Sequence, residues 1–314
     1  MDAVDAHQHL WPEAVLRCLE RRNEPPCAMW DGAVWHVSLA GEPAFAVDPA
    51  DHDPFARAAA VRDDGLDRAL VALSTPVGIE ALPAGEAETI LAAWAAAGRA
   101  LPQELQAWGS VALDLSPAEL GFATHDALDA GAAGVVIPAG ALAGRGGLDR
   151  IAPVLDVLER RLAPAFIHPG PAPWTRPAAT VPEGWWAPVT RYVSELHTAW
   201  HTWSAWGRDQ HPSLRTVWAA LAGLAPLHAE RSALRDGPDA DLPDPLAFFD
   251  TSGYGPRAVR SVACAVGRSQ LVHGTDRPVV RRDPLAGEPL GLETHAAMRT
   301  DNVARALGTA WVVA

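Results

Sequence analysis

Short apolar runs alternate with helical stretches along the whole chain. The runs consist of β-branched and other apolar residues, and most are bounded by Gly, Pro or Asp, which is typical of buried parallel strands. We predict eight strands, at Val4–His9, Arg68–Ser74, Leu105–Leu113, Gly134–Pro138, Ala163–His168, Leu214–Leu221, Leu246–Thr251 and Gln270–Thr275.

Helices are predicted between these strands. Pro54–Asp63 follows Asp53, a favourable N-cap residue. The segment Ser116-Pro117-Ala118-Glu119 combines a capping box with proline at the first helical position, so a helix begins there. Further helices are expected at Glu86–Arg99, Asp149–Arg161, Trp186–Arg208, Pro226–Arg235, Pro256–Val266 and Glu293–Leu307.

Strands that alternate with helices indicate an α/β protein, and eight of them favour a (β/α)8 TIM barrel. The alternative is a doubly wound open sheet, because periodicity does not distinguish a closed sheet from an open one. No internal repeat or linker composition divides the chain, so we expect a single domain over residues 1–314.

Two insertions interrupt the alternation. Trp30–Asp48 alternates apolar and polar residues around Ala40-Gly41, which predicts a β-hairpin after the first strand. Gly170–Gly184 is a Pro/Trp-rich loop after the fifth strand, long enough to be a lid or a binding segment. In a barrel both insertions lie at the C-terminal face, where active sites are built.

Composition excludes several classes of function. The chain has 314 residues, a net charge of −13 and 25 basic residues, all of them arginine. Without lysine there is no P-loop lysine, Schiff base or carbamylated lysine, and an acidic chain lacks the positive field that nucleic acids require. We find no apolar run of about 18 residues and no secretory signal, so no membrane span is expected. The three cysteines are odd in number and their spacing matches no zinc site, so we expect reduced thiols in a cytoplasmic protein.

Polar residues that bind metals follow three of the predicted strands. His7 and His9 lie two apart near the end of the first strand, so their side chains point the same way. His168 closes the fifth strand, and Asp276 follows the eighth. These four side chains meet only if the barrel closes, and three imidazoles with one carboxylate suit Zn²⁺ or a similar divalent ion.

The motifs V-D-A-H-Q-H-L, F-I-H-P-G, F-F-D-T-S and H-G-T-D-R-P, in that order, resemble the amidohydrolase superfamily. They are most similar to its single-metal amidohydrolase-related branch, which contains aminocarboxymuconate-semialdehyde decarboxylase, related aromatic-acid decarboxylases and hydrolases. The resemblance spans essentially the whole chain. It implies that His7, His9, His168 and Asp276 bind one divalent metal ion, with Mn²⁺, Fe²⁺ or Co²⁺ as alternatives to Zn²⁺, and that the protein is a homodimer.

One position departs from the family pattern. The family has a histidine at the end of the sixth strand, where this chain has Ala220. His228 begins the next helix near the predicted barrel mouth, so it is a candidate replacement for the missing catalytic histidine. The alternative is that His228 lies on an exposed helix face and has no catalytic role. His197 and His201 share a helix face by their spacing, which permits metal binding, but the sequence Leu-His-Thr-Ala-Trp-His-Thr-Trp around them favours helix packing.

Other residues near the predicted mouth are candidates for substrate binding. Arg277 is able to bind a carboxylate in bidentate fashion or to form a structural ion pair. Tyr254 is placed to donate a hydrogen bond, and Trp11 and Trp174 are candidate pocket walls. Asp250 either orients a ligand or caps its strand.

From these residues we expect a metal-dependent hydrolase of a small cyclic amide, lactone or related C–N or C–O bond. A metal-activated water would attack, and Asp276 would accept and return the proton. The first alternative is a metal-dependent non-oxidative decarboxylase of an aromatic or enoic acid. The second is a catalytically inactive metal-binding barrel, favoured only by Ala220.

Overall fold

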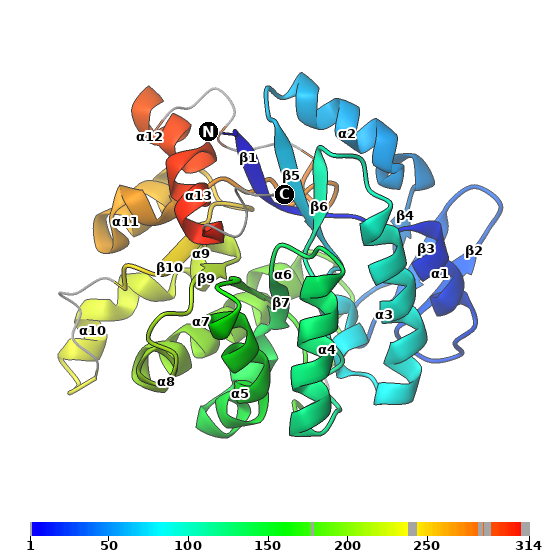
Figure 1. Cartoon of the computed structure of the whole chain (residues 1–314), viewed down its shortest axis with the longest axis horizontal. Helices are drawn as coiled ribbons and strands as arrows, with labels where there is room; N and C mark the ends of the chain where they lie inside the picture. The colour runs from blue at the N-terminus through cyan, green and yellow to red at the C-terminus, as the bar shows by residue number, and fades with distance from the viewer. Residues whose placement is uncertain (1, 177–178, 238–243, 282–284, 286–289, 309–314) are drawn as a thin grey trace.

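The computed structural model describes residues 2–176, 179–237, 244–281, 285 and 290–308. Helices surround a central set of parallel strands, and the chain alternates between the two (Figure 1). No helix of the described part is long and apolar enough to cross a membrane.

Each predicted strand is present, although several are shorter than predicted. The parallel strands are β1 (Val4–His9), β5 (Arg68–Ala72), β6 (Leu105–Ala107), β7 (Val135–Pro138), β8 (Ala165–His168), β9 (Thr216–Trp218), β10 (Ala247–Asp250) and β11 (Leu271–Val272). They form two sheets, ordered β1-β5-β6 and β11-β10-β9-β8-β7, with every neighbouring pair parallel.

Isolated parallel bridges join the two sheets at both edges. Gly109, after β6, pairs with Val135 of β7, and Gln8 of β1 pairs with Arg277, after β11. A buried apolar cluster contains side chains from β1, β5, β7, β8, β9, β10 and β11, and it includes Phe166 and Phe248. The strands of both sheets therefore face one common interior.

Helices cover the outside of these strands. They are α1 (Glu13–Glu20), α2 (Pro54–Asp63), α3 (Ala84–Arg99), α4 (Pro117–Asp129), α5 (Arg145–Arg160), α6 (Trp186–Val189), α7 (Arg191–Thr202), α8 (Arg208–Gln210), α9 (Ala220–Gly223), α10 (Ala229–Ala233), α11 (Pro256–Val266), α12 (Leu292–Arg299) and α13 (Asp301–Leu307). The predicted bounds of α2 and α11 are confirmed, and Ser116 and Glu119 form the capping box at the start of α4.

Three predicted helices are interrupted. Trp186–Arg208 divides into α6, α7 and α8, with a π-helical turn at Trp203–Gly207. Pro226–Arg235 consists of a 3₁₀ turn (Ala225–His228) and the short α10, and the last predicted helix breaks at Thr300 between α12 and α13. The apolar pattern continues through each break, so the pattern alone does not reveal it.

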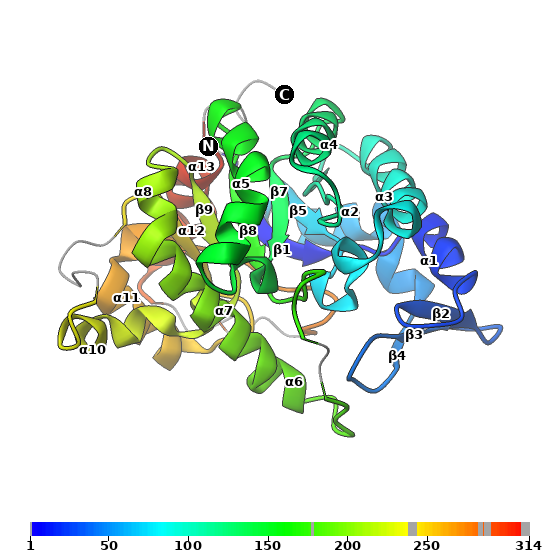
Figure 2. The same ribbon diagram turned by 90° about the horizontal axis from the view of Figure 1, so that it is seen from below.

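The two insertions lie on the same side of the molecule (Figure 2). The first contains three antiparallel strands, β2 (Cys27–Trp30), β3 (Trp35–Ser38) and β4 (Phe45–Val47), of which β3 and β4 pair across the predicted turn. The second precedes α6; its residues 177–178 lie outside the described residues. The insertions touch, because Val181 N donates to the carbonyl of Gly41 at 3.2 Å. Tyr192 of α7 also contacts the first insertion, since its Oη donates to Glu42 Oε1 at 2.7 Å.

Candidate metal centre

Two histidines project from the end of β1. The register of β1 against β5 shifts between Asp5 and Gln8, so the strand is irregular just where the histidines begin. His7 Nε2 and His9 Nε2 lie 3.1 Å apart, and the two rings are nearly perpendicular. Both side chains are buried.

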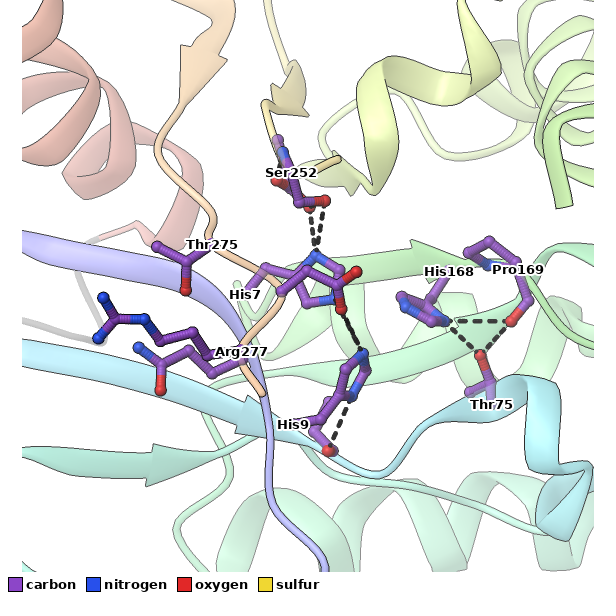
Figure 3. A network of polar contacts seen from close by, with 12 residues as sticks. His7, His9, Thr75, His168, Pro169, Ser252, Thr275 and Arg277 are labelled. Atoms are coloured by element: carbon purple, nitrogen blue, oxygen red, sulfur yellow. Dashed lines mark hydrogen bonds and ion pairs between the residues drawn. The ribbon is translucent and has the colours of Figure 1, made fainter. Parts of the chain in front are cut away.

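His168, at the end of β8, completes a three-histidine cluster. Its ring centre lies 5.0 Å from those of both His7 and His9. One nitrogen from each of the three side chains lies within 4.8 Å of the other two. The ends of β1 and β8, distant in sequence, thus bring three buried imidazoles to one point, as Figure 3 shows.

Each imidazole is held through its Nδ1 atom. His9 Nδ1 lies 3.2 Å from the carbonyl oxygen of Ala72, and His168 Nδ1 lies 2.7 Å from Thr75 Oγ1 and 3.1 Å from the carbonyl oxygen of Pro169 (Figure 3). A histidine that donates from Nδ1 presents the lone pair of Nε2, which is the usual arrangement around a bound metal.

Asp250, at the end of β10, holds His7. Its Oδ2 lies 2.5 Å from His7 Nδ1, and Ser252 Oγ lies 3.1 Å from the same nitrogen. The Asp250 side chain is fully buried and also accepts hydrogen bonds from the backbone and hydroxyl of Ser252. Of the two roles that the sequence leaves open for Asp250, the structure therefore favours orienting a candidate ligand.

Asp276 lies beside the cluster. Its Oδ1 is 3.1 Å from His9 Nε2 and 3.5 Å from His7 Nε2. Its φ of 59° is in the left-handed region, which aspartate tolerates better than most residues, and its backbone N–H donates to the carbonyl of His7 at 2.8 Å. The side chain is 20% exposed, so this carboxylate lies between the buried histidines and solvent.

The charges around His7 favour a cation. Burial lowers the pKa of His7, but the carboxylates of Asp250, Asp276 and Asp5 outweigh burial and raise it to about 9. Burial lowers the pKa of His168 well below its usual value, and the neighbouring His7 and His9 lower it further. Three converging imidazoles beside a carboxylate are a donor set that fits a divalent ion, which would take the place of the proton between the rings.

Two further residues, Asp5 and Gly274, support the cluster. Asp5 is buried and accepts hydrogen bonds from Thr275 N, Thr275 Oγ1 and Gln8 Nε2, which fixes β1 against the segment after β11. A side chain at Gly274 would meet Asp250 Oδ1 at 2.2 Å, so only glycine lets this segment approach the cluster. Both residues belong to the motifs quoted above, but their partners are distant in sequence.

The arginine and tryptophan candidates lie differently from the histidines. Arg277 forms an ion pair with Asp64 and points away from the three histidines in Figure 3. Trp11 is 5% exposed and packs against Phe45, so it belongs to the core beneath β4 rather than to an open wall. Trp174 is half-buried beneath Arg150, whose guanidinium lies 5.0 Å from its ring centre.

Tyr254 and His228 differ in their surroundings. Tyr254 is half-buried just after β10, and its hydroxyl makes no hydrogen bond within the described part of the chain. His228 is exposed, and its ring contact is with His197, at 4.9 Å between ring centres, rather than with the candidate metal cluster. His197 also contacts His201, at 4.6 Å.

Ala220 lies in an unusual turn after β9. Ala220, Leu221, Ala222, Gly223 and Leu224 all have φ between 46° and 62°, which makes α9 a left-handed turn. Such a conformation costs about 1–2 kcal/mol for each residue other than glycine. The strand predicted to reach Leu221 ends at Trp218 because this turn replaces it.

No protein-family model matches the chain. No curated protein matches its sequence either. Solved structures share its fold: the IDCase of Metarhizium anisopliae has a TM-score of 0.76 at 18% identity, over 98% of this chain and 97% of that one. 5-Carboxyvanillate decarboxylase LigW from Sphingomonas paucimobilis has a TM-score of 0.68 at 17% identity, over 98% of both chains. The manganese-containing 5-carboxyvanillate decarboxylase from Novosphingobium aromaticivorans has a TM-score of 0.65 at 16% identity, over 80% of this chain and 79% of that one.

These neighbours contradict the expectation of a hydrolase of cyclic amides or lactones, which is wrong. Two of the three are named as decarboxylases of an aromatic acid, so the first alternative fits the comparisons better. The physical reason for the error is that the same metal-binding residues serve either to activate water or to hold a carboxylate. At these identities the comparisons establish a shared fold and no more.

Proposed function

We propose that this chain is a metal-dependent, non-oxidative decarboxylase of an aromatic carboxylic acid. The observation that carries the proposal is the convergence of His7, His9 and His168 beside Asp276, in a fold shared with two 5-carboxyvanillate decarboxylases. We further propose a closed (β/α)8 barrel that spans residues 1–314 as one domain. The bridges at both sheet edges and the shared interior cluster support closure.

In this proposal His7, His9, His168 and Asp276 hold one divalent metal ion. Zn²⁺ suits three imidazoles and a carboxylate, and Mn²⁺ is the alternative supported by the manganese in a neighbouring structure. When bound, the ion would supply Lewis-acid chemistry for a substrate carboxylate or an adjacent hydroxyl. Asp250 and Thr75 keep the imidazoles of His7 and His168 oriented for that task.

Asp276 is our candidate for the proton transfer. Decarboxylation breaks the bond between the ring carbon and the carboxylate carbon, CO₂ leaves, and the electron pair remains on the ring until a proton replaces CO₂. Asp276 is partly exposed while it lies next to His9, so its carboxyl group is able to take a proton from solvent and deliver it to that carbon. No water is incorporated into the aromatic product.

The remaining candidates have smaller roles in the proposal. The Tyr254 hydroxyl and the Trp174 ring are candidate substrate contacts. The His228 ring contacts His197, so a catalytic role for His228 requires a rearrangement that moves it toward the three-histidine cluster. We do not assign Arg277 or Trp11 to the substrate, because Arg277 pairs with Asp64 and Trp11 is buried beneath β4. A cytoplasmic location and a homodimer also remain proposals, from the cysteine content and from the family resemblance.

The function is tested with purified protein loaded separately with Zn²⁺ and Mn²⁺ and given 5-carboxyvanillate and a panel of hydroxybenzoates. We expect CO₂ release and, in D₂O, one deuterium on the carbon that lost the carboxylate. Asp276→Asn should lower turnover by at least about a hundredfold, the scale of lost general acid catalysis. CO₂ is measured by a coupled assay and deuterium by mass spectrometry.

Tyr254→Phe is the matched control, because it changes one hydroxyl near the site without touching the histidines. We expect a change mainly in KM for this variant. If neither metal form releases CO₂ from any acid of the panel, or if Asp276→Asn keeps full turnover, the proposal is wrong.

A further inference from the structure

A second polar site lies where Arg57 of α2 contacts Gln8 and the backbone of His9 at the end of β1. A cavity of about 320 Å³ separates α2 and the 3₁₀ turn Pro49–His52 from the segment that follows Asp276. Arg57, Arg277 and Arg281 line it, together with Asp51 and small apolar residues of α2. Three arginines around one cavity are notable in a chain with a net charge of −13.

Arg57 is a buried cation that lacks an acidic partner. Its side chain is 6% exposed, and its hydrogen bonds go to neutral oxygens: Gln8 Oε1 at 3.0 Å and the backbone carbonyls of His9, Arg277 and Asp51. No ion pair to Arg57 occurs among the described residues. Buried charges in proteins are usually paired, because an unpaired one loses its hydration without compensation.

The other two arginines add to this positive charge. The guanidinium of Arg277 is paired with Asp64, so its charge is largely compensated. Arg281 is exposed and forms no ion pair within the described part of the chain. Among the described residues that line the cavity, Asp51 is the one acidic residue, so these residues give the cavity an excess of positive charge.

We propose that this cavity binds the oxyanion group of a small ligand, a carboxylate or a phosphate. Planar guanidinium groups bind both kinds of oxyanion through paired hydrogen bonds. Ala56 and Ala60 of α2 and Pro278 line the same cavity, and they provide apolar contacts for the rest of a small organic anion. The cavity is separate from the metal centre, because Arg277 points away from the three histidines (Figure 3).

The site is connected to the metal centre through the backbone. Arg57 Nη1 donates to the carbonyls of His9 and Arg277, and His9 N donates to the carbonyl of Arg277 at 2.6 Å. His9 is a candidate metal ligand, and Arg277 follows Asp276, another one. An anion that holds Arg57 in place therefore supports the segments that carry two candidate ligands, whatever reaction the centre performs.

Calorimetric titration of the full-length protein with inorganic phosphate and, separately, with benzoate tests the proposal. We expect saturable binding of at least one anion, weakened at least about tenfold in Arg281→Ala, the loss expected for one charge-assisted contact. Arg281→Lys keeps the positive charge but loses the planar guanidinium group, so its anion affinity should lie between those of the unchanged protein and Arg281→Ala. Because the proposed metal centre also binds aromatic carboxylates, only the binding that Arg281→Ala weakens is assigned to this cavity. If that binding is tighter for phosphate, the cavity is a phosphate site, and if it is tighter for benzoate, the cavity is a carboxylate site.

Arg260→Ala is the matched control, because Arg260 is an exposed arginine of α11 without an ion pair in the described residues. It removes the same charge from another part of the surface, and we expect affinity within about twofold of the unchanged protein. Absence of saturable binding at about 10 mM of either anion would overturn the proposal. Equal weakening by Arg260→Ala and Arg281→Ala, or no weakening by Arg281→Ala, would overturn it as well.

Discussion

Replacement of His168 with alanine is expected to abolish tight metal binding and catalytic turnover. His168 is the one member of the three-histidine cluster that comes from β8, so its loss leaves only the two neighbouring imidazoles of β1 and Asp276. We expect metal affinity to fall by at least about a hundredfold, which is more than the typical loss when a residue that only hydrogen-bonds to a metal ligand is replaced. Elemental analysis after dialysis and direct metal titration measure the effect.

Two further variants separate a metal ligand from a residue that merely stabilises the fold. Thr75→Val removes the hydroxyl that lies 2.7 Å from His168 Nδ1, and we expect a loss of about 10- to 100-fold in metal affinity. His125→Ala removes a histidine of α4 that contacts Arg161, and metal content should not change. Full metal occupancy in His168→Ala, or an equal loss in His125→Ala, would exclude the three-histidine site.

The strands that carry the candidate site are predictable from the sequence because buried parallel strands are short apolar runs with polar residues at their ends. Val4–His9 and Ala165–His168 end on histidines, and the alternation of side chains places His7 and His9 on one face. The hydrogen-bond partners of these histidines are harder to predict from the sequence. His7 and Asp250 are 243 residues apart, so only the folded chain shows that their side chains meet.

The position of a residue next to the candidate site in sequence does not determine which way its side chain points. Arg277 is adjacent to Asp276 in sequence, but the backbone of Asp276 is left-handed rather than extended, with a φ of 59°. Arg277 forms an ion pair with Asp64, which is one of the two roles that the sequence left open for it. Trp11 follows the strand that carries His7 and His9, yet Trp11 is buried and packs against Phe45 of the first insertion. Which face an insertion covers depends on tertiary packing, and the local pattern does not contain that information.

Replacement of Glu80 with glutamine is expected to stabilise the protein at pH 8 much more than at pH 5. Glu80 lies in the 3₁₀ turn Ile79–Ala81 and is 1% exposed. Ser110 Oγ donates to its Oε1 at 2.5 Å, whereas Oε2 is buried without a hydrogen-bond partner in the described structure. Burial raises the pKa of Glu80 from 4.5 to about 7, although the hydrogen bond from Ser110 opposes this.

The direction of the pH effect follows from the protons that each state binds. Between pH 4.5 and about 7 the folded protein keeps a proton on Glu80 that the unfolded chain releases, so the free energy of unfolding falls as pH rises. Above pH 7 the folded state also releases the proton, and the penalty is complete. Glutamine does not titrate, so the advantage of Glu80→Gln should grow by about 2 kcal/mol between pH 5 and pH 8.

Thermal and denaturant unfolding at pH 5, 6, 7 and 8 measure this advantage, with Glu88→Gln as the control. Glu88 is an exposed carboxylate of α3, and its replacement should change stability equally at each pH. A pH-independent difference for Glu80→Gln, or the same pH dependence for Glu88→Gln, would show that Glu80 is not a buried acid with a raised pKa.

The position of Glu80 gives the result a meaning beyond stability. Glu80 follows β5 in the same connection as Thr75, whose hydroxyl holds His168. Buried polar groups without partners are concentrated at functional sites, and Glu80 Oε2 is such a group in the described structure. If Glu80→Gln is more stable but binds metal or substrate less well, the buried acid supports the candidate centre through this connection. If stability rises and binding is unchanged, its role is limited to the hydrogen bond with Ser110.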